Sequence, residues 1–111
     1  MFGFGSKPAH AEIGPHELDA MLRDGAATVI DVREVDEFAA GHIPGAINVP
    51  LSRFDPAALP DAGGRRRILN CAGGKRSAMA LDRCATAQAA IDTHLAGGFG
   101  AWKAAGLPVE R

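Results

Sequence analysis

The chain has 111 residues, of which 47% are hydrophobic and 23% are charged, and its formal net charge is −1. This length suits one domain with a single core, and this composition is that of a globular protein and excludes a disordered chain. Because the net charge is close to zero, no global field would attract nucleic acid or an anionic membrane, and we expect neither as a partner.

The first half of the chain predicts alternating strands and helices after a short tail. Residues 1–7, with Phe2 and Phe4 among glycines, are expected to form a flexible tail, and residues 8–111 are expected to form one domain. The elements expected next are a short strand at 12–13, a helix from Pro15 to the Asp24-Gly25 stop, a buried strand over 26–30, a short helix before the Pro44-Gly45 turn and a buried strand over 46–49.

The second half of the chain continues this alternation. After a short 3₁₀ segment between Pro56 and Pro60, we expect a strand over 67–70, a helix over 77–89, a strand over 91–95, a break at Gly97-Gly98 and a closing helix over 99–105. Strands and helices that alternate at these lengths predict an α/β fold. The expected architecture is one mainly parallel sheet of about five strands with helices on both faces.

Three segments are expected to meet where the strands end. Asp31-Val32-Arg33 follows the strand over 26–30, Cys71 follows the strand over 67–70, and Gly97-Gly98 follows the last strand. Ligands of open α/β sheets bind at the carboxyl ends of the strands. The sequence therefore places a thiol at the edge where a ligand is expected.

The segment around this thiol, LNCAGGKRSA over residues 69–78, has features that activate a cysteine. A free cysteine has a pKa of about 8.5, and a helix N-terminus or nearby cations lower it to roughly 3.5–7.5. Gly73 and Gly74 let successive backbone N–H groups point inward as an anion nest. A helix from about Ser77, with that residue as its N-cap, would direct its positive end at the same place.

Two cations in the same segment add positive charge, because Lys75 and Arg76 follow the glycines and a planar guanidinium suits oxyanions. The alternative is that Cys71 is a small buried hydrophobe in a plain turn. A phosphate-binding P-loop does not fit the segment. Its pattern, GxxxxGK[ST], would need glycine at position 69 and serine or threonine at position 76, where the chain has Leu69 and Arg76.

Three segments resemble, in order and in spacing, the sequence signatures of single-domain rhodaneses. They are DVREVDEFAAGHIPGAINVPL over 31–51, NCAGGKRS over 70–77 and LAGGFGAW over 95–102, and the resemblance covers roughly residues 12–109. It implies the rhodanese fold and a sulfurtransferase that uses thiosulfate or a persulfide, with a cysteine persulfide as intermediate and no cofactor. By this resemblance Cys71 carries the sulfur, and the rest of its six-residue loop binds the substrate: Ala72, Gly73, Gly74, Lys75 and Arg76.

The spacing from Cys71 to Arg76 separates sulfur chemistry from phosphate chemistry. Cell-cycle phosphatases and arsenate reductases resemble this fold, but they use Cys-x5-Arg to surround a tetrahedral oxyanion, whereas this chain has Cys-x4-Arg. The shorter ring suits a single sulfur atom on the thiolate. The Cys71 thiolate is expected to take the outer sulfur of the donor and to pass it to cyanide or to a thiol, which is covalent catalysis with ping-pong kinetics.

Arg33 and Cys84 each have two interpretations. Arg33 leaves its strand at the ligand edge and is a candidate for binding an anionic donor, but a structural role is favoured, in which it pairs with Asp31, Glu34 or Glu37. Cys84 lies three residues after Leu81 in the helix that follows the loop, so it is interpreted as a core residue. The alternative is a resolving thiol that forms a disulfide with Cys71.

Several residues of types that often act in catalysis or binding are interpreted as structural in this sequence. His42 lies in the GHIPG turn, His94 lies within an apolar strand, and Trp102 has helical spacing from Phe99. The cluster Arg65-Arg66-Arg67 has no interleaved aromatic residues, so it is interpreted as a solvated strand entrance and not as a nucleic-acid site.

Two classes of function stay open, an active sulfurtransferase and a protein-interaction module on the same fold. The combination of Cys71 with Gly74 and Arg76 favours the enzyme. The partners implied are a small-molecule sulfur donor and a thiol acceptor, with a protein persulfide as an alternative partner. The two cysteines have no zinc spacing, so we expect no metal, and together with the lack of a signal-peptide pattern they suit a reducing, cytoplasmic location.

Overall fold

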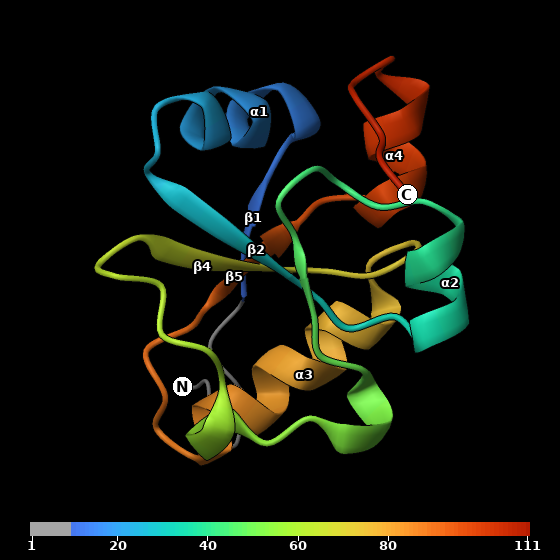
Figure 1. The fold of residues 1–111 in the computed structure, drawn as a ribbon. Coiled ribbons are helices and arrows are strands. Elements are labelled where there is room, and N and C mark those ends of the chain that lie inside the picture. Colours follow the sequence, from blue (N-terminus) through green and yellow to red (C-terminus); the bar gives the residue numbers. More distant parts are fainter. Residues whose placement is uncertain (1–9) are drawn as a thin grey trace, which may run out of the picture.

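Five short strands rich in apolar residues pair side by side in the computed structural model, which describes residues 10–111 (Figure 1). All the pairings are parallel, and the strand order is β1-β5-β4-β2-β3. In chain order the elements are β1 Ala11–Ile13, α1 Pro15–Arg23, β2 Ala27–Asp31, α2 Val35–Ala40, β3 Ile47–Asn48, the 3₁₀ turns η1 Leu51–Arg53 and η2 Pro56–Ala58, β4 Arg66–Asn70, α3 Lys75–Thr86, β5 Thr93–Leu95 and α4 Gly98–Ala104. The predicted α/β fold with a five-stranded parallel sheet is confirmed. The predicted tail over residues 1–7 lies outside the described residues.

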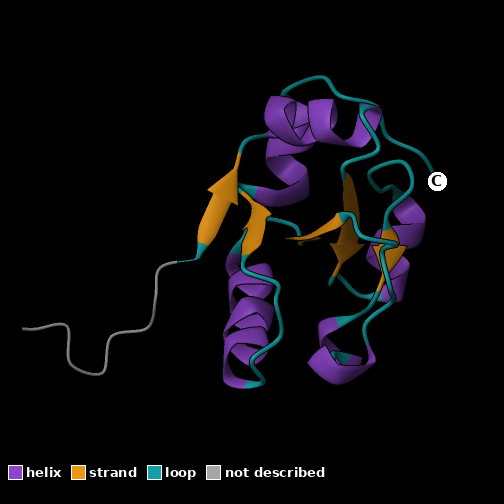
Figure 2. Cartoon of the chain, turned by 90° about the vertical axis from the view of Figure 1, so that its left-hand side faces the viewer, coloured by secondary structure: helices purple, strands orange, loops and turns teal. Residues whose placement is uncertain are grey.

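The sheet has a separate apolar core on each face, because side chains alternate along each strand. Val29 of β2 and Ile68 of β4 point to one face, where they pack with Leu18 of α1 and with Phe99 and Trp102 of α4. The neighbouring residues, Ile30 and Leu69, point to the opposite face, where they pack with Ala80, Leu81 and Cys84 of α3. Figures 1 and 2 show the helices on both sides of the strands. None of the helices in the described part of the chain combines the length and apolar character needed to cross a membrane.

The ends of two helices differ from those predicted. The helix after the cysteine loop begins at Lys75 and not at Ser77, because Gly74 adopts a left-handed φ of 110° and already serves as the N-cap. The same helix ends at Thr86 and not at residue 89, since Gln88 has a φ of 58° that no α-helix can continue. The closing helix begins at Gly98, one residue earlier than predicted, and β5 is shorter than the predicted strand over 91–95.

The three segments predicted to converge do meet at the carboxyl ends of the strands. The backbone N–H of Val32 donates to the carbonyl oxygen of Asn70 at 2.8 Å, which joins the ends of β2 and β4. The N–H of Phe99 donates to the carbonyl oxygen of Cys71 at 2.7 Å, which joins the start of α4 to the cysteine loop. A Cβ atom on Gly98 would lie 2.5 Å from that same carbonyl oxygen. Only glycine permits this approach.

We therefore expect Gly98→Ala to destabilise the fold more than Gly63→Ala, a control at a glycine with nearly the same φ. The φ of Gly63 is 60° and that of Gly98 is 61°, but nothing lies within 4 Å of a Cβ placed on Gly63. The control should cost only the left-handed conformation, about 1–2 kcal/mol. The clash at Gly98 should add about 1–3 kcal/mol. Urea denaturation of both variants measures the difference, and equal losses would show that the contact with the cysteine loop is unimportant.

Candidate active site

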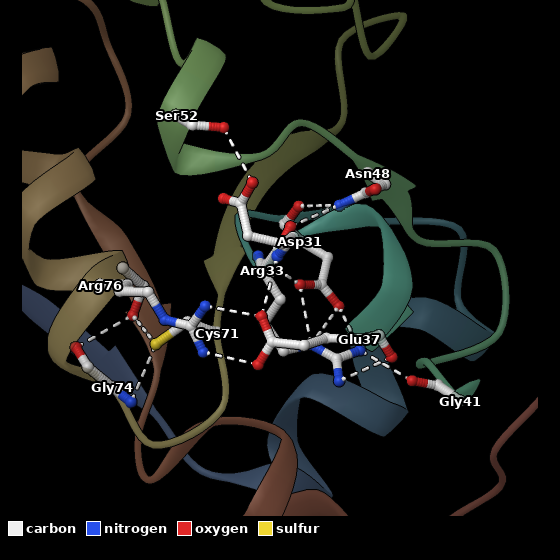
Figure 3. Close-up of polar contacts among 11 residues, drawn as sticks. Asp31, Arg33, Glu37, Gly41, Asn48, Ser52, Cys71, Gly74 and Arg76 are labelled. Carbon is white, nitrogen blue, oxygen red and sulfur yellow. Dashed lines mark hydrogen bonds and ion pairs between the residues drawn. The ribbon is translucent and has the colours of Figure 1, made fainter. Parts of the chain in front are cut away.

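The sulfur of Cys71 lies in the turn that joins β4 to α3, where backbone N–H groups surround it. The N–H of Gly74 donates to the Cys71 Sγ atom at 3.0 Å, a contact that Figure 3 draws. The glycine conformation at position 74 brings the first turn of α3 directly behind the sulfur, so the positive end of the helix faces it. The cysteine side chain is buried, with 1% of its surface exposed. The predicted nest for an anion is therefore present around this atom.

These hydrogen-bond donors change the acidity of the thiol. Burial raises the pKa of Cys71, because it disfavours the charged form. The Ser77 hydroxyl and the backbone N–H groups of Ser77, Gly74 and Gly73 act in the opposite direction and outweigh it, so the pKa lies below its ordinary value. The loop therefore favours the nucleophilic thiolate over the inert thiol.

Ser77 has a different role from the one predicted for it. Because α3 begins at Lys75, Ser77 is not the N-cap but lies one turn inside the helix, with its side chain directed at the loop. Its Oγ atom lies 3.5 Å from the Cys71 Sγ atom, 3.1 Å from the carbonyl oxygen of Gly74 and 2.7 Å from His94 Nδ1. Sequence reasoning interpreted His94 as a core histidine with satisfied hydrogen bonds and did not connect it to the thiol.

Arg76 extends from the loop to α2, where it forms a paired ion bridge with Glu37. Its Nη1 and Nη2 atoms lie 2.7 and 2.9 Å from the two carboxylate oxygens (Figure 3). Arg76 lowers the pKa of Glu37 to about 2. Glu37 is held in place by the first turn of α2, where its Oε1 atom also accepts the N–H of Glu34 at 2.9 Å. Direct binding of the thiolate or the donor by Arg76 stays a prediction.

Arg33 is buried, and its guanidinium is fully engaged in holding the chain together. Its Nη2 atom lies 2.8 Å from the Asp31 carboxylate and 2.8 Å from the carbonyl oxygen of Gly41. Its Nε atom also donates to Asp31, and the group lies over the Phe99 ring, 4.4 Å from the centroid. These contacts support the structural interpretation, which was the favoured one. Donor binding by Arg33 stays a prediction.

A pocket of about 370 Å³ lies beside the cysteine loop, against the exposed residue Ala72. Lys103 of α4 contributes a cation to its wall, and Phe99 and Gly100 form part of its floor. The remaining lining residues are Arg33, Glu37, Ala40 and Gly41. Sequence reasoning missed Lys103 and Glu37 as residues of this site. A helix-terminal lysine and a helical glutamate are common, and only the packing of α2 and α4 at the sheet edge brings them together.

His42, Trp102 and Cys84 make the structural contacts predicted for them. His42 donates through Nδ1 to the Phe38 carbonyl oxygen at 2.8 Å and stacks on the Phe38 ring. Trp102 is buried and donates to the Pro108 carbonyl oxygen at 2.7 Å. Cys84 is buried in the apolar core beside α3, and this burial raises the pKa of its thiol. A buried thiol with a raised pKa is a poor nucleophile. Lys75, by contrast, is one of the loop residues expected to bind substrate, and it is exposed at the start of α3.

Comparison with known proteins places this fold and loop in one family. The model of the rhodanese-like domain matches residues 14–105. The chain belongs to this family. The rhodanese-like chain is 40% identical over 106 residues to an uncharacterized protein of Synechocystis, and the match covers 96% of this chain and 59% of that protein.

Two relatives of the rhodanese-like chain are named for sulfur transfer. The human thiosulfate:glutathione sulfurtransferase is 49% identical over 41 residues, which are 37% of this chain and 36% of that protein. The crystal structure of a thiosulfate sulfurtransferase from Pseudomonas aeruginosa superposes with a TM-score of 0.78 at 32% identity, over 93% of this chain and 20% of that one. The chain spans less than two thirds of the length of each of these relatives.

The ion pair between Glu37 and Arg76 predicts a pH-dependent contribution to stability. The pKa of Glu37 falls from an ordinary value of 4.5 to about 2 in the folded protein, so the contribution is complete above about pH 4.5 and is lost as the pH falls toward 2. Because 31% of the Arg76 side chain and 35% of the Glu37 side chain are exposed, the pair should contribute below about 1 kcal/mol. Glu37→Gln should therefore be slightly less stable than the wild type at pH 7 and equally stable near pH 2. A constant difference in the free energy of unfolding across this range would contradict the assignment.

Proposed function

We propose that this chain is a sulfurtransferase that carries a sulfur atom as a persulfide on Cys71. The observation that supports this most is the Cys71 sulfur at the N-terminus of α3, with Gly74 N–H at 3.0 Å and with a pKa below its ordinary value. The same N–H groups would stabilise the terminal sulfur of a persulfide, which is also anionic. Membership of the rhodanese-like family and the two sulfurtransferase relatives support the same class of reaction.

The reaction would proceed in two displacements. The Cys71 thiolate attacks the outer sulfur of thiosulfate, a new sulfur–sulfur bond forms, and sulfite leaves with the electron pair of the bond that breaks. In the second displacement the thiolate of an acceptor attacks the terminal sulfur of the Cys71 persulfide. The acceptor leaves as a persulfide and Cys71 is released as a thiolate. Neither displacement needs a cofactor, and the two together give ping-pong kinetics.

The surroundings of the loop suit a donor with a negative charge and a projecting sulfur. The 1% exposure of Cys71 leaves room only for an end-on approach by a sulfur atom that projects from the donor. Lys103 lines the pocket beside Ala72, and Arg76 is paired with Glu37, another residue that lines this pocket. Thiosulfate and low-molecular-weight persulfides have both features, and a protein persulfide presented on a flexible segment is a further donor. A reducing compartment such as the cytoplasm would keep Cys71 reduced.

The second candidate, a module that only binds a partner, is not favoured. Such a module would need neither a depressed pKa at Cys71 nor a ring of donors around its sulfur, and both are present. Phosphate transfer is also disfavoured, because only four residues separate Cys71 from Arg76, one fewer than in the Cys-x5-Arg loops that surround a tetrahedral oxyanion.

We expect wild-type protein incubated with thiosulfate to gain the mass of one sulfur atom, and Cys71→Ser to gain none. Intact-mass spectrometry and thiocyanate formation from thiosulfate and cyanide measure the two half-reactions. Cys84→Ala is the matched control, since it removes the other thiol and should retain both activities. Transfer by Cys71→Ser at the wild-type rate would refute the proposal, as would efficient hydrolysis of an aryl phosphate by the wild type.

Substitutions of Arg76 and of Glu37 should change kcat/KM for thiosulfate in opposite directions. Arg76→Ala should lower kcat/KM for thiosulfate about ten- to a hundredfold, the effect of losing one charge-assisted contact, and Arg76→Lys should restore part of it. Glu37→Gln releases the guanidinium from its partner and should raise kcat/KM roughly two- to fivefold, which corresponds to an exposed pair of below about 1 kcal/mol. A fall for both variants would mean that the ion pair only fixes the loop.

A further inference from the structure

A continuous line of polar contacts leads from the buried Cys71 sulfur, through the interior, to Glu12 of the edge strand β1. The Cys71 Sγ atom lies 3.5 Å from Ser77 Oγ, and Ser77 Oγ lies 2.7 Å from His94 Nδ1. The other ring nitrogen of this histidine, Nε2, lies 3.3 Å from a carboxylate oxygen of Glu12. Cys71, Ser77 and His94 are all buried, whereas 57% of the Glu12 side chain is exposed. The line therefore connects a thiol with little access to water to a carboxylate at the surface.

We propose that Ser77 and His94 form a proton relay that removes the proton of the Cys71 thiol toward Glu12. This inference rests on the proposed function, because the relay prepares the thiolate that attacks the donor. Ser77 Oγ has two acceptors within reach of its single proton, the Gly74 carbonyl oxygen at 3.1 Å and His94 Nδ1 at 2.7 Å. In the relay-competent state the Cys71 S–H donates to Ser77 Oγ, the Ser77 O–H turns to the shorter contact and donates to the unprotonated Nδ1 of His94, and the Nε2–H of His94 donates to Glu12. Ser77 and His94 thus each accept one hydrogen bond and donate another in the same direction.

Proton transfer along this line balances without a further reactant. The thiol proton passes to Ser77 Oγ as the hydroxyl proton passes to His94 Nδ1. The products are a Cys71 thiolate, a neutral serine that now donates to it, and a His94 imidazolium whose charge is offset by Glu12. No other bond forms or breaks. The reverse transfer returns the proton when Cys71 is protonated again, so His94 acts through Ser77 as a positioning residue.

The charged groups around His94 suit a proton acceptor that is neutral at rest. Burial lowers the pKa of His94, the neighbouring His10 lowers it further, and Glu12 of β1 raises it. His10 itself is hydrogen-bonded to Asp82 of α3 at 2.8 Å. On the other side of β5, His94 pairs with the apolar Leu69 of β4, which adds no charge. The lowered pKa favours the neutral imidazole, and Glu12 is placed to stabilise the imidazolium once it forms.

The pH dependence of Cys71 alkylation tests the relay without a sulfur donor, so its outcome is independent of the sulfurtransferase assignment. His94→Asn retains a hydrogen-bonding group near Ser77 but cannot take up a proton. We expect it to raise the apparent pKa of alkylation by iodoacetamide by about one unit, as loss of a charge partner does. Alkylation should then be about tenfold slower at neutral pH and equal to the wild-type rate at high pH. His16→Asn, on the exposed face of α1, is the matched control and should leave the profile unchanged.

A second measurement keeps His94 in place, so it tests the proton relay even if His94→Asn does not fold. The ring of His94 is titrated by NMR in the wild type and in Cys71→Ala. If the two groups exchange a proton, they titrate as a coupled pair, and removal of the thiolate should lower the His94 pKa. An unchanged titration of His94, or a folded His94→Asn variant with the wild-type alkylation profile, would overturn the proposal and leave the contact as a structural hydrogen bond.

Discussion

The contact between the Gly74 N–H and the Cys71 sulfur is the interaction on which the rest of the site depends. It exists because the parallel strand β4 ends at Asn70, directly before Cys71, the chain turns through a left-handed glycine, and α3 then begins at Lys75. The helix thereby brings its free N–H groups to the sulfur, where they favour an anion in a place that burial alone would make unfavourable. The turn at Gly74 thus contributes to the low pKa of the thiol, together with the Ser77 hydroxyl and the other N–H groups of the loop.

Contacts from two other elements, α4 and α2, fix the position of the loop. On the α4 side, the approach of Gly98 to the Cys71 carbonyl oxygen fixes the first part of the loop. On the α2 side, the Arg76 guanidinium is tied to Glu37, and Arg33 ties the end of α2 to the end of β2 through Gly41 and Asp31. The two arginines thus have different positions in the site. Arg33 is buried and saturated, while Arg76 is partly exposed and has a partner that an anion could replace.

The loop also forms side-chain hydrogen bonds on the side that faces the protein interior. Ser77 uses one hydroxyl to contact the sulfur, the Gly74 carbonyl oxygen and His94, and the residue is buried. A buried polar group of this kind costs free energy unless it is hydrogen-bonded, so the three contacts account for its presence. They also give the thiol a connection to ionisable groups that does not pass through the pocket beside Ala72.

The sequence by itself determined the order of the elements and the chemistry of the loop. Apolar runs of strand length are local features that predict strands, and the glycines at 73 and 74 and the six-residue interval from Cys71 to Arg76 are local features that predict an anion-binding turn. The tertiary structure decided which side chains meet. Arg76 and its partner Glu37 are 39 residues apart, and Ser77 and His94 are 17 apart. Both pairings follow from the strand order β1-β5-β4-β2-β3, which sets β5 beside β4 and brings α2 to the end of the sheet. The start of α3 likewise depended on the φ of Gly74, because a glycine permits several conformations and only the packing around the loop selects one.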